Sequence, residues 1–356
     1  MFLLLWNVHP VQGPSERVRS DFVTQPTECL PPVNAEGRQC LARLLSDPPS
    51  CWLAGVKIGI QLPEIEREVR WPELREMVLL IEEAGFDSMW VGDHLLYRAP
   101  HIGVAGPWEA WTQLAAIAAL TERVEFGPLV ASTSFHSPAM IAKKAATIEE
   151  ISGGRLILGL GAGWNETEYR AFGFAYDHRV SRFEEAFTII RTLLSEGEID
   201  FEGRYYSIRD CAIVPRGPRK EGPPLMIGSQ GPRMLAITAP YMDQWNAWHA
   251  WFGNDPGRLG PILEKLDGAL IEAGRDPSEV EKSAAVLVRF GGGSRRVVGD
   301  PSRGVSEPLA GTHAEVATRL KEYRVLGIKH LQLVLDPISL ASITEMAEVL
   351  PGVKSQ

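Results

Sequence analysis

The sequence predicts an α/β protein whose main domain is a (β/α)8 barrel with an insertion after the fourth strand. From Val56 onward, short β-rich runs alternate with amphipathic helical stretches, as in parallel strands joined by crossover helices. Eight such units fill about 300 residues, a common length for this barrel. Polar or glycine-rich runs follow several of the strands. In a parallel barrel, these C-terminal strand ends form the active-site mouth.

The first four strand–helix units are predicted from strand runs and from helix start and stop signals. Trp71-Pro72 opens the first helix, because Pro suits the first helical turn, and Gly85 ends it. Apolar residues of that helix recur at i, i+3, i+4 and i+7, which places them on one face. These signals predict strands at 56–61, 88–92, 124–130 and 155–161, a helix after Trp71, and helices across 108–120 and 141–151.

The insertion and the last four units follow from the same kinds of signal. The insertion is predicted to hold a helix near 180–194 and a hairpin at 201–206. Thr312 and Glu315 form a capping-box pattern that opens a late helix. The remaining strands are predicted at 224–228, 244–248, 283–290 and 330–335, with a helix at about 261–273 and a closing helix that runs to 350.

Residues 1–55 differ from the rest of the chain. They hold three of the four cysteines and several prolines, and they show no sustained period. Two hypotheses account for them: translation starts at Val56 and the preceding segment is an artefact, or the segment is a real, loosely ordered extension. The domain prediction is therefore an extension at 1–55 and a barrel at 56–350. An intact-mass measurement on protein from the native host separates the two.

Composition narrows the function classes. The net charge is −9 and no dense Lys/Arg cluster occurs, which weighs against a nucleic-acid partner. No apolar run reaches the roughly 18–20 residues of a membrane span. The sequence has no CxxC pair and no His-x-His, so no metal site is predicted, and a reducing, cytoplasmic setting fits best.

Asp93 and His94 follow the second predicted strand and are the candidate catalytic residues. Histidine is the side chain whose protonation changes near neutral pH, and an adjacent Asp can orient it or favour its cation. The alternative is an Asp-His pair that only caps the next helix. Polar and glycine-rich runs at the other strand ends favour the catalytic interpretation.

Two glycine-rich runs are candidate cofactor contacts. Gly159, Gly161 and Gly163 lie at alternate positions, which leaves a floor for a flat ring or, alternatively, permits tight barrel packing. The run Gly228-Ser229-Gln230-Gly231 precedes a helix, and the unpaired N–H groups of a helix N-terminus suit phosphate. Arg233 adds a possible charge-assisted contact to that phosphate. An ordinary strand–helix turn is the alternative for the second run.

Aromatic and charged residues near the mouth have two interpretations each. Trp245 and Trp248 can wall a substrate pocket or fill the core. Glu166 and Glu168 lie in the insertion after strand four. The charged residues of this segment are expected to be mostly solvated, or paired along a helix.

Taken together, these motifs resemble the bacterial luciferase-like family of flavin- and deazaflavin-dependent oxidoreductases. Within that family, Asp-His after strand two is similar to the subgroup that uses the deazaflavin coenzyme F420. The motifs that carry the resemblance lie at 85–94, 121–124, 136–138, 152–155, 159–164, 201–206, 228–233 and 243–246.

The resemblance implies a cofactor in the barrel mouth and a small-molecule substrate. The ring would stack near strands three and four, at a non-proline cis peptide near Leu129-Val130, with Gly161 and Ala162 close by. The phosphate would lie on the four residues Gly228, Ser229, Gln230 and Gly231. Relatives are commonly dimers or larger, so a homodimer is an expectation.

Three functions are carried forward. The first is hydride transfer between F420 and an organic substrate, with His94 as general acid or base and Asp93 setting its orientation. The second is a monooxygenase that uses reduced FMN, and the third is a non-catalytic flavin-binding barrel. Trp164 stands where F420-dependent sugar-phosphate dehydrogenases carry a catalytic Glu, so such a substrate is not expected, and Trp164 is assigned to the substrate pocket.

Overall fold

The fold is described from a computed structural model of the 356-residue chain. The structure describes residues 55–99, 103–291, 293 and 306–354. The predicted extension at 1–55 lies, except for Gly55, outside the described residues. So does most of the Gly/Arg-rich loop after the seventh predicted strand.

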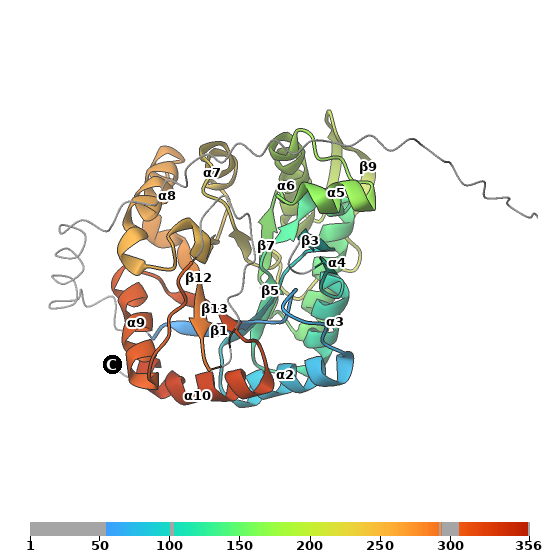
Figure 1. Cartoon of the computed structure of the whole chain (residues 1–356). Coiled ribbons are helices and arrows are strands. Elements are labelled where there is room, and N and C mark those ends of the chain that lie inside the picture. The colour runs from blue at the N-terminus through green and yellow to red at the C-terminus, as the bar shows by residue number, and fades with distance from the viewer. Residues whose placement is uncertain (1–54, 100–102, 292, 294–305, 355–356) are drawn as a thin grey trace, which may run out of the picture. The chain divides into compact units, whose positions relative to one another are not determined.

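A parallel barrel forms the centre of the described part (Figure 1). Its strands are bonded in the order β5-β2-β1-β13-β12-β11-β10-β7-β6, and every pairing among them is parallel. The predicted barrel is confirmed, and each predicted strand overlaps an observed one. The strands are β1 Lys57–Gln61, β2 Ser88–Val91, β5 Glu125–Pro128, β6 Ala131–Ser132, β7 Leu158–Gly161, β10 Leu225–Ile227, β11 Gln244–Ala247, β12 Glu281–Arg289 and β13 His330–Asp336.

The third barrel strand is split into two pieces, whereas the sequence predicts one run. β5 pairs with β2 and β6 pairs with β7, so the two pieces together connect both neighbours. A cis peptide between Leu129 and Val130 separates them, at the place the resemblance implies. The bridge between Phe126 and Leu156 links β5 to the segment before β7 and closes the ring.

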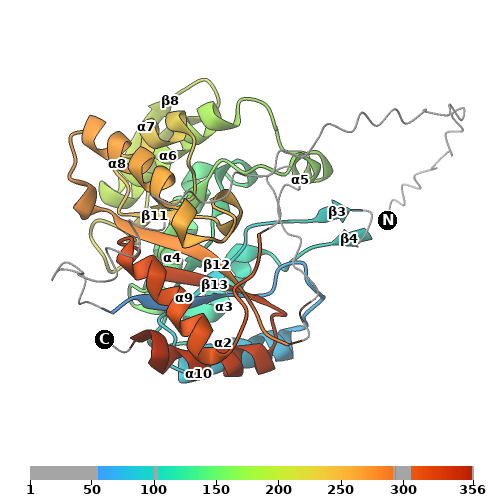
Figure 2. The same cartoon turned by 60° about the vertical axis from the view of Figure 1, so that its left-hand side comes forward.

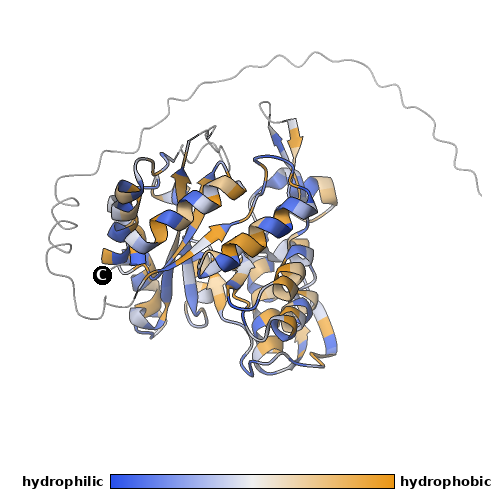
Figure 3. Ribbon diagram, turned by 90° about the horizontal axis from the view of Figure 1, so that it is seen from below, coloured by the Kyte–Doolittle hydropathy of each residue, from blue (hydrophilic) through white to orange (hydrophobic). Residues whose placement is uncertain are grey.

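The helices cover the outside of the barrel and present apolar faces to it. In α2, Leu74, Met77, Val78 and Ile81 are buried, as the i, i+3, i+4, i+7 pattern predicts. Hydrophobic and hydrophilic residues alternate along the helices (Figure 3). None of the helices in the described ranges is both long and apolar enough to span a membrane. The helices are α2 Trp71–Glu83, α3 Ala110–Leu120, α4 Pro138–Ser152, α5 Glu166–Phe172, α6 Arg179–Ser195, α7 Pro232–Thr238, α8 Gly260–Glu272, α9 His313–Val325 and α10 Leu340–Lys354.

Helix ends agree with the signals in the sequence. The predicted capping box is present at α9, where the Thr312 hydroxyl accepts from Glu315 N and the Glu315 carboxylate accepts from Thr312 N. Gly153 ends α4 in the left-handed region with φ +64°. These local rules hold because cap geometry depends on residues that are close in sequence.

Two antiparallel hairpins form separate two-stranded sheets outside the barrel sheet. The predicted one forms from β8 Glu198–Glu202 and β9 Ser207–Ala212. The other, β3 Tyr97–Ala99 with β4 Gly103–Ala105, lies beside α5 and was not predicted (Figure 2). Each of its strands has only three residues, which is too short for a period to show.

Large side chains and buried polar networks fill the barrel interior. The Trp90 indole donates to the Ser88 hydroxyl at 2.8 Å, and Ser88 pairs with His330 Nε2 at 2.7 Å. All three side chains are fully buried. The interior is therefore a packed core, and its apolar members are Trp90, Leu129, Ile157, Met226, Ala285, Leu287 and Val334.

Candidate active site

The predicted site residues meet at one end of the barrel. Because the strands are parallel, their C-terminal ends share one rim. Asp93 Oδ2 accepts a hydrogen bond from Ser132 N at 2.9 Å, and Ser132 pairs in register with Gly161. A Cβ on Gly161 would lie 4.0 Å from the Gly228 carbonyl oxygen. A chain of contacts thus runs along the rim from the Asp-His segment to the predicted phosphate loop.

His94 is held by Glu168, which belongs to the charged group that was expected to be mostly solvated or paired along a helix. His94 Nδ1 lies 2.7 Å from Glu168 Oε1, and Leu95 N donates to the same carboxylate at 3.2 Å. The Glu168 side chain is fully buried, so the expectation of solvation is wrong for it. Asn165, the N-cap of α5, donates to both Glu168 and the Leu96 carbonyl. The start of α5 therefore clamps the segment that carries His94.

A second buried carboxylate faces the other ring nitrogen of His94. Glu64, in the loop after β1, has its Oε1 3.7 Å from His94 Nε2 and is 3% exposed. Gln61 and the Tyr97 hydroxyl both donate to this carboxylate. A Cβ on Gly92 would lie 2.9 Å from Glu64 Cδ, so glycine there leaves room for the carboxylate. The sequence interpretation missed Glu64 because it is one of several acidic residues in an irregular loop.

These carboxylates change the protonation of His94. Burial alone would lower the pKa of His94, because it disfavours the charged ring. The charges of Glu64, Glu168 and Asp93, together with the hydrogen bond to Glu168, outweigh that effect and hold the pKa above its ordinary value. The His94 side chain keeps 20% of its surface exposed. The raised pKa keeps the imidazole cationic to higher pH than in a free histidine, and its exposed part lets solutes reach it, which suits proton donation.

Asp93 has a different role from the expected one. The sequence predicts that Asp93 orients the imidazole of His94. In the structure, the carboxylate that is hydrogen-bonded to His94 Nδ1 belongs to Glu168. Asp93 instead accepts from Ser132 N and lies 3.4 Å from His136 Nε2. Its Oδ1 is buried and has no hydrogen-bond partner among the residues that the structure describes. Asp93 therefore links the segment after β2 to β6, and its Oδ1 remains available to accept a hydrogen bond.

The glycines of β7 face the side chain of Val130 rather than empty space. A Cβ on Gly159 would lie 2.9 Å from Val130 Cγ1, and one on Gly161 would lie 2.8 Å from Val130 Cγ2. Gly228 is equally close to Val130, at 3.0 Å. Tight packing, the alternative interpretation of the glycine run, therefore accounts for Gly159. Leu129 is buried beneath the rim and packs in the barrel interior.

The predicted phosphate loop, residues 228–231, is partly exposed and is held from behind by Trp245. The indole of Trp245 donates to the Ser229 carbonyl at 2.7 Å, and Trp245 is fully buried. Of its two predicted roles, pocket wall or core residue, Trp245 has the second: it packs in the core, supports this loop and does not line an open pocket. Arg233 donates to Ser181 and Glu184 on α6, so its charge is already paired. A phosphate here would depend on backbone N–H groups and the Ser229 hydroxyl.

The other two predicted pocket residues remain near the mouth. The Trp164 ring meets the His94 ring edge-on, with centroids 5.6 Å apart, and is 37% exposed. Arg179 and Tyr176 both donate to the Trp164 carbonyl and fix its position. Trp248 is half-buried against the interior cluster of the barrel. Trp164 therefore forms an aromatic wall beside the acid–base group.

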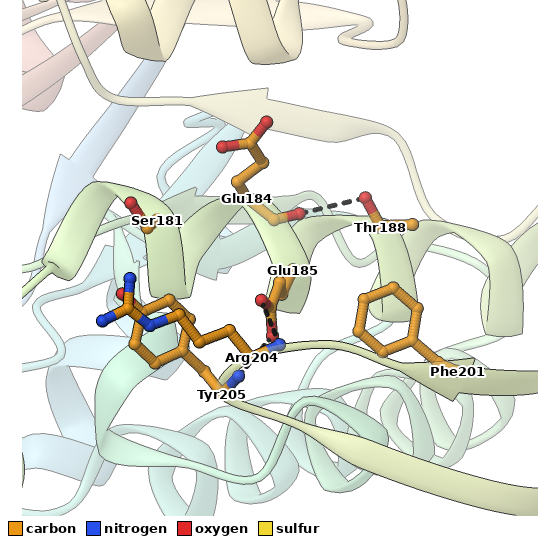
Figure 4. A pocket seen from close by; sticks show the side chains of 7 residues that line it. All are labelled: Ser181, Glu184, Glu185, Thr188, Phe201, Arg204 and Tyr205. Atoms are coloured by element: carbon orange, nitrogen blue, oxygen red, sulfur yellow. Dashed lines mark hydrogen bonds between the residues drawn. The ribbon is translucent and has the colours of Figure 1, made fainter.

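One surface hollow has a volume of about 400 Å³ (Figure 4). It separates α6 from the β8–β9 hairpin. Glu185 at its centre accepts from the backbone N–H groups of Arg204, Tyr205 and Tyr206. These bonds anchor the hairpin on α6, which is a structural role.

The comparisons with known proteins agree with this geometry. Residues 54–295 match the luciferase-like monooxygenase family, so the chain belongs to that family of oxidoreductases. A phthiodiolone/phenolphthiodiolone dimycocerosates ketoreductase from Mycobacterium kansasii is 34% identical over 218 residues, 56% of this chain and 58% of that protein. An F420-dependent glucose-6-phosphate dehydrogenase from Microbacterium testaceum is 33% identical over 225 residues, 61% of this chain and 64% of that protein. The matched region thus spans about three fifths of each relative.

Solved structures support the fold. An F420-dependent secondary alcohol dehydrogenase in complex with an F420-acetone adduct superposes with a TM-score of 0.72. The match covers 85% of this chain and all of that chain, at 21% identity. At this identity, the likeness establishes the luciferase-like barrel and leaves the chemistry to the site itself.

Proposed function

We propose that this protein is an F420-dependent oxidoreductase that transfers hydride between the deazaflavin and an organic substrate, with His94 as the general acid or base. The observation that carries the proposal is the imidazole at the barrel mouth between two buried carboxylates. A carboxylate pair around one imidazole favours its cation, which is the form that donates a proton. A sequence relative whose name includes F420 adds support.

The residues present fit such a cofactor. A Cβ on Gly231 would meet only Ser229 Oγ, at 3.9 Å, so the space in front of the loop is open. Gly228 N already donates to the Leu160 carbonyl at 3.4 Å and Gly231 N to Ser229 Oγ at 3.3 Å, so within residues 228–231 the N–H groups of Ser229 and Gln230 would hold the phosphate. Gly161, Ala162, Leu129 and Val130 would lie beneath the ring. Asp93 Oδ1, buried and without a partner, is an acceptor for a donor on the ring or substrate. When bound, F420 supplies a carbon centre that accepts or gives hydride.

His94 moves the proton that accompanies the hydride. In the reducing direction the imidazolium protonates the substrate oxygen, and in the oxidising direction the neutral ring removes that proton. Trp164 and Tyr97 flank the ring of His94 and exclude water from one side of it. General acid–base help of this kind is worth about 10² to 10⁴ in rate.

A titration against both cofactors tests the proposal first. The full chain is titrated with F420 and with FMN, followed by absorbance and fluorescence. Binding of F420 with at least tenfold preference over FMN supports the proposal. A reversed preference assigns the protein to the FMN-dependent monooxygenases, and binding of either cofactor without turnover assigns it to non-catalytic flavin binding.

The second test measures turnover with a panel of secondary alcohols and glucose 6-phosphate. F420 reduction is compared among the wild type, His94→Ala and the control His313→Ala, which removes an exposed histidine of α9. We expect His94→Ala to lower kcat about 10²- to 10⁴-fold with little change in F420 affinity. Unchanged kcat in His94→Ala removes His94 from the mechanism. Because Trp164 replaces the catalytic Glu, we expect glucose 6-phosphate to be a poor substrate.

A further inference from the structure

The two carboxylates that flank His94 come from separate elements and stand at different distances. Glu168 belongs to α5 and Glu64 to the loop after β1, and both are buried. A buried carboxylate without partners is costly, so each needs donors around it. For Glu168 these donors are His94 Nδ1, Leu95 N and the Asn165 amide. All three lie on the segment after β2 or at the start of α5.

The two carboxylates lie at different distances from the two nitrogens of the His94 ring. The separation between Nδ1 and Glu168 Oε1 is 2.7 Å, which is a hydrogen bond. The separation between Nε2 and Glu64 Oε1 is 3.7 Å, which is beyond hydrogen-bond range. Nε2 is therefore the ring nitrogen that can exchange a proton with a bound molecule. Glu64 acts on it through charge at this distance.

We propose that Glu168 is a positioning residue that accepts a hydrogen bond from Nδ1–H of His94. Because this bond keeps the proton on Nδ1, Nε2 is the nitrogen that exchanges a proton with the substrate. The inference rests on the proposed function, because it assigns roles within the same acid–base step. In that step the Nε2–H bond breaks as the O–H bond of the substrate forms, and the Nδ1 proton stays on the ring. Glu64 supplies a second negative charge that stabilises the imidazolium.

The charged groups around the ring set the sign of its pH dependence. They are Glu64 from the loop after β1, Glu168 from α5 and Asp93 on the adjoining residue, while Tyr97 and Trp164 supply neutral rings. Their negative charges raise the pKa of His94, so the acid form persists to higher pH than in a free histidine. Activity that needs this acid falls as the pH rises through the raised pKa. Removing a carboxylate moves that fall to lower pH.

Nitrogen NMR of ring-labelled histidine tests the inference without any cofactor. The His94 signals are assigned by their loss in His94→Ala, and their shifts report both the titration midpoint and the tautomer. The variants are Glu168→Gln, which keeps an oxygen acceptor but removes the charge, Glu168→Ala, which removes both, and Glu64→Gln. Glu166→Gln, an exposed neighbour on α5, is the matched control.

The expected results separate charge from hydrogen bonding. Neutral His94 in the wild type carries its proton on Nδ1. We expect the midpoint to fall by about one unit or more in both Gln variants, in line with the effect of one nearby opposite charge. Glu168→Gln keeps the Nδ1–H tautomer, whereas Glu168→Ala loses that preference. The control Glu166→Gln changes neither the titration midpoint nor the tautomer of His94.

Two results overturn the inference: a neutral wild-type ring protonated on Nε2, or a Glu168→Gln midpoint equal to that of the control. A failure of F420 to bind refutes the proposed function and leaves these ring measurements intact. If turnover is found, the pH profile of kcat/KM gives a second readout. Its limb for His94 then moves in Glu168→Gln by the same amount as the NMR midpoint.

Discussion

Gly163, just before Trp164, is a position at the mouth where a single methyl group should be costly. Its φ is +71°, in the left-handed region, which costs an alanine about 1–2 kcal/mol. A Cβ there would also overlap the hydroxyls of Tyr169 and Ser132 and come within 3.0 Å of Tyr169 Cζ. Tyr169 is fully buried, so its ring cannot move aside freely.

The cost of Gly163→Ala follows from the bonds that Tyr169 would lose. Its hydroxyl donates to the Ala162 carbonyl at 2.6 Å and pairs with Ser132 Oγ at 3.2 Å. Leaving these buried groups unpaired costs about 1–3 kcal/mol each. Together with the backbone term, we expect Gly163→Ala to lower the free energy of unfolding by about 3–8 kcal/mol.

Gly153→Ala is the matched control for Gly163→Ala. Gly153 has a φ of +64°, but a Cβ there would have nothing within 4 Å, so its alanine variant measures the backbone term alone. Urea unfolding of both variants, followed by circular dichroism, should show Gly163→Ala to be less stable than the control by at least about 2 kcal/mol. Equal losses would show that the Tyr169 hydroxyl network adds nothing to stability.

Two further predictions concern the supports of the site. Trp245→Phe removes the donor to the Ser229 carbonyl, so we expect about fivefold weaker F420 binding by fluorescence titration. Trp251→Phe is the control, and an equal loss of F420 affinity in that variant would contradict a specific role for Trp245. Arg219→Met leaves the buried Glu149 carboxylate without its paired guanidinium, and we expect a loss of about 3 kcal/mol in urea unfolding. Adding Glu149→Gln to Arg219→Met should recover part of that loss in unfolding free energy. A double variant that is no more stable than Arg219→Met would argue against the unpaired charge as the cause.

The sequence predicted the features that depend on neighbouring residues. Strand runs and caps such as Thr312 are local, so the barrel and the α9 capping box were both predicted correctly. Glu168 shows where this reasoning stops. It lies three residues after the N-cap Asn165, a spacing that is typical of a carboxylate serving its own helix end. In the structure it accepts from the Asn165 side chain and also from His94 and Leu95, which lie more than 70 residues earlier in the chain.

Tryptophan side chains show the same limit. Trp245 and Trp248 lie three residues apart at the end of one strand, and composition treats them alike. Trp248 packs on the interior cluster, whereas Trp245 packs in the outer core and supports residue 229. The side of the sheet that each faces depends on strand register, which a four-residue strand defines only once its neighbours are in place.

Histidines at the two ends of the barrel differ in exposure and in the number of buried carboxylates around them, and this difference supports the assignment of the site. His330 is completely buried; its Nε2 pairs with the Ser88 hydroxyl, and its Nδ1 lies 3.5 Å from the partly exposed carboxylate of Glu281. His94 keeps a fifth of its side chain exposed and faces two buried carboxylates. A barrel that needed only stability would have no use for the second arrangement, because each buried carboxylate costs free energy unless it is paired. The imidazolium offsets that cost and leaves Nε2 available, so the stability and the chemistry of the mouth depend on the same ring.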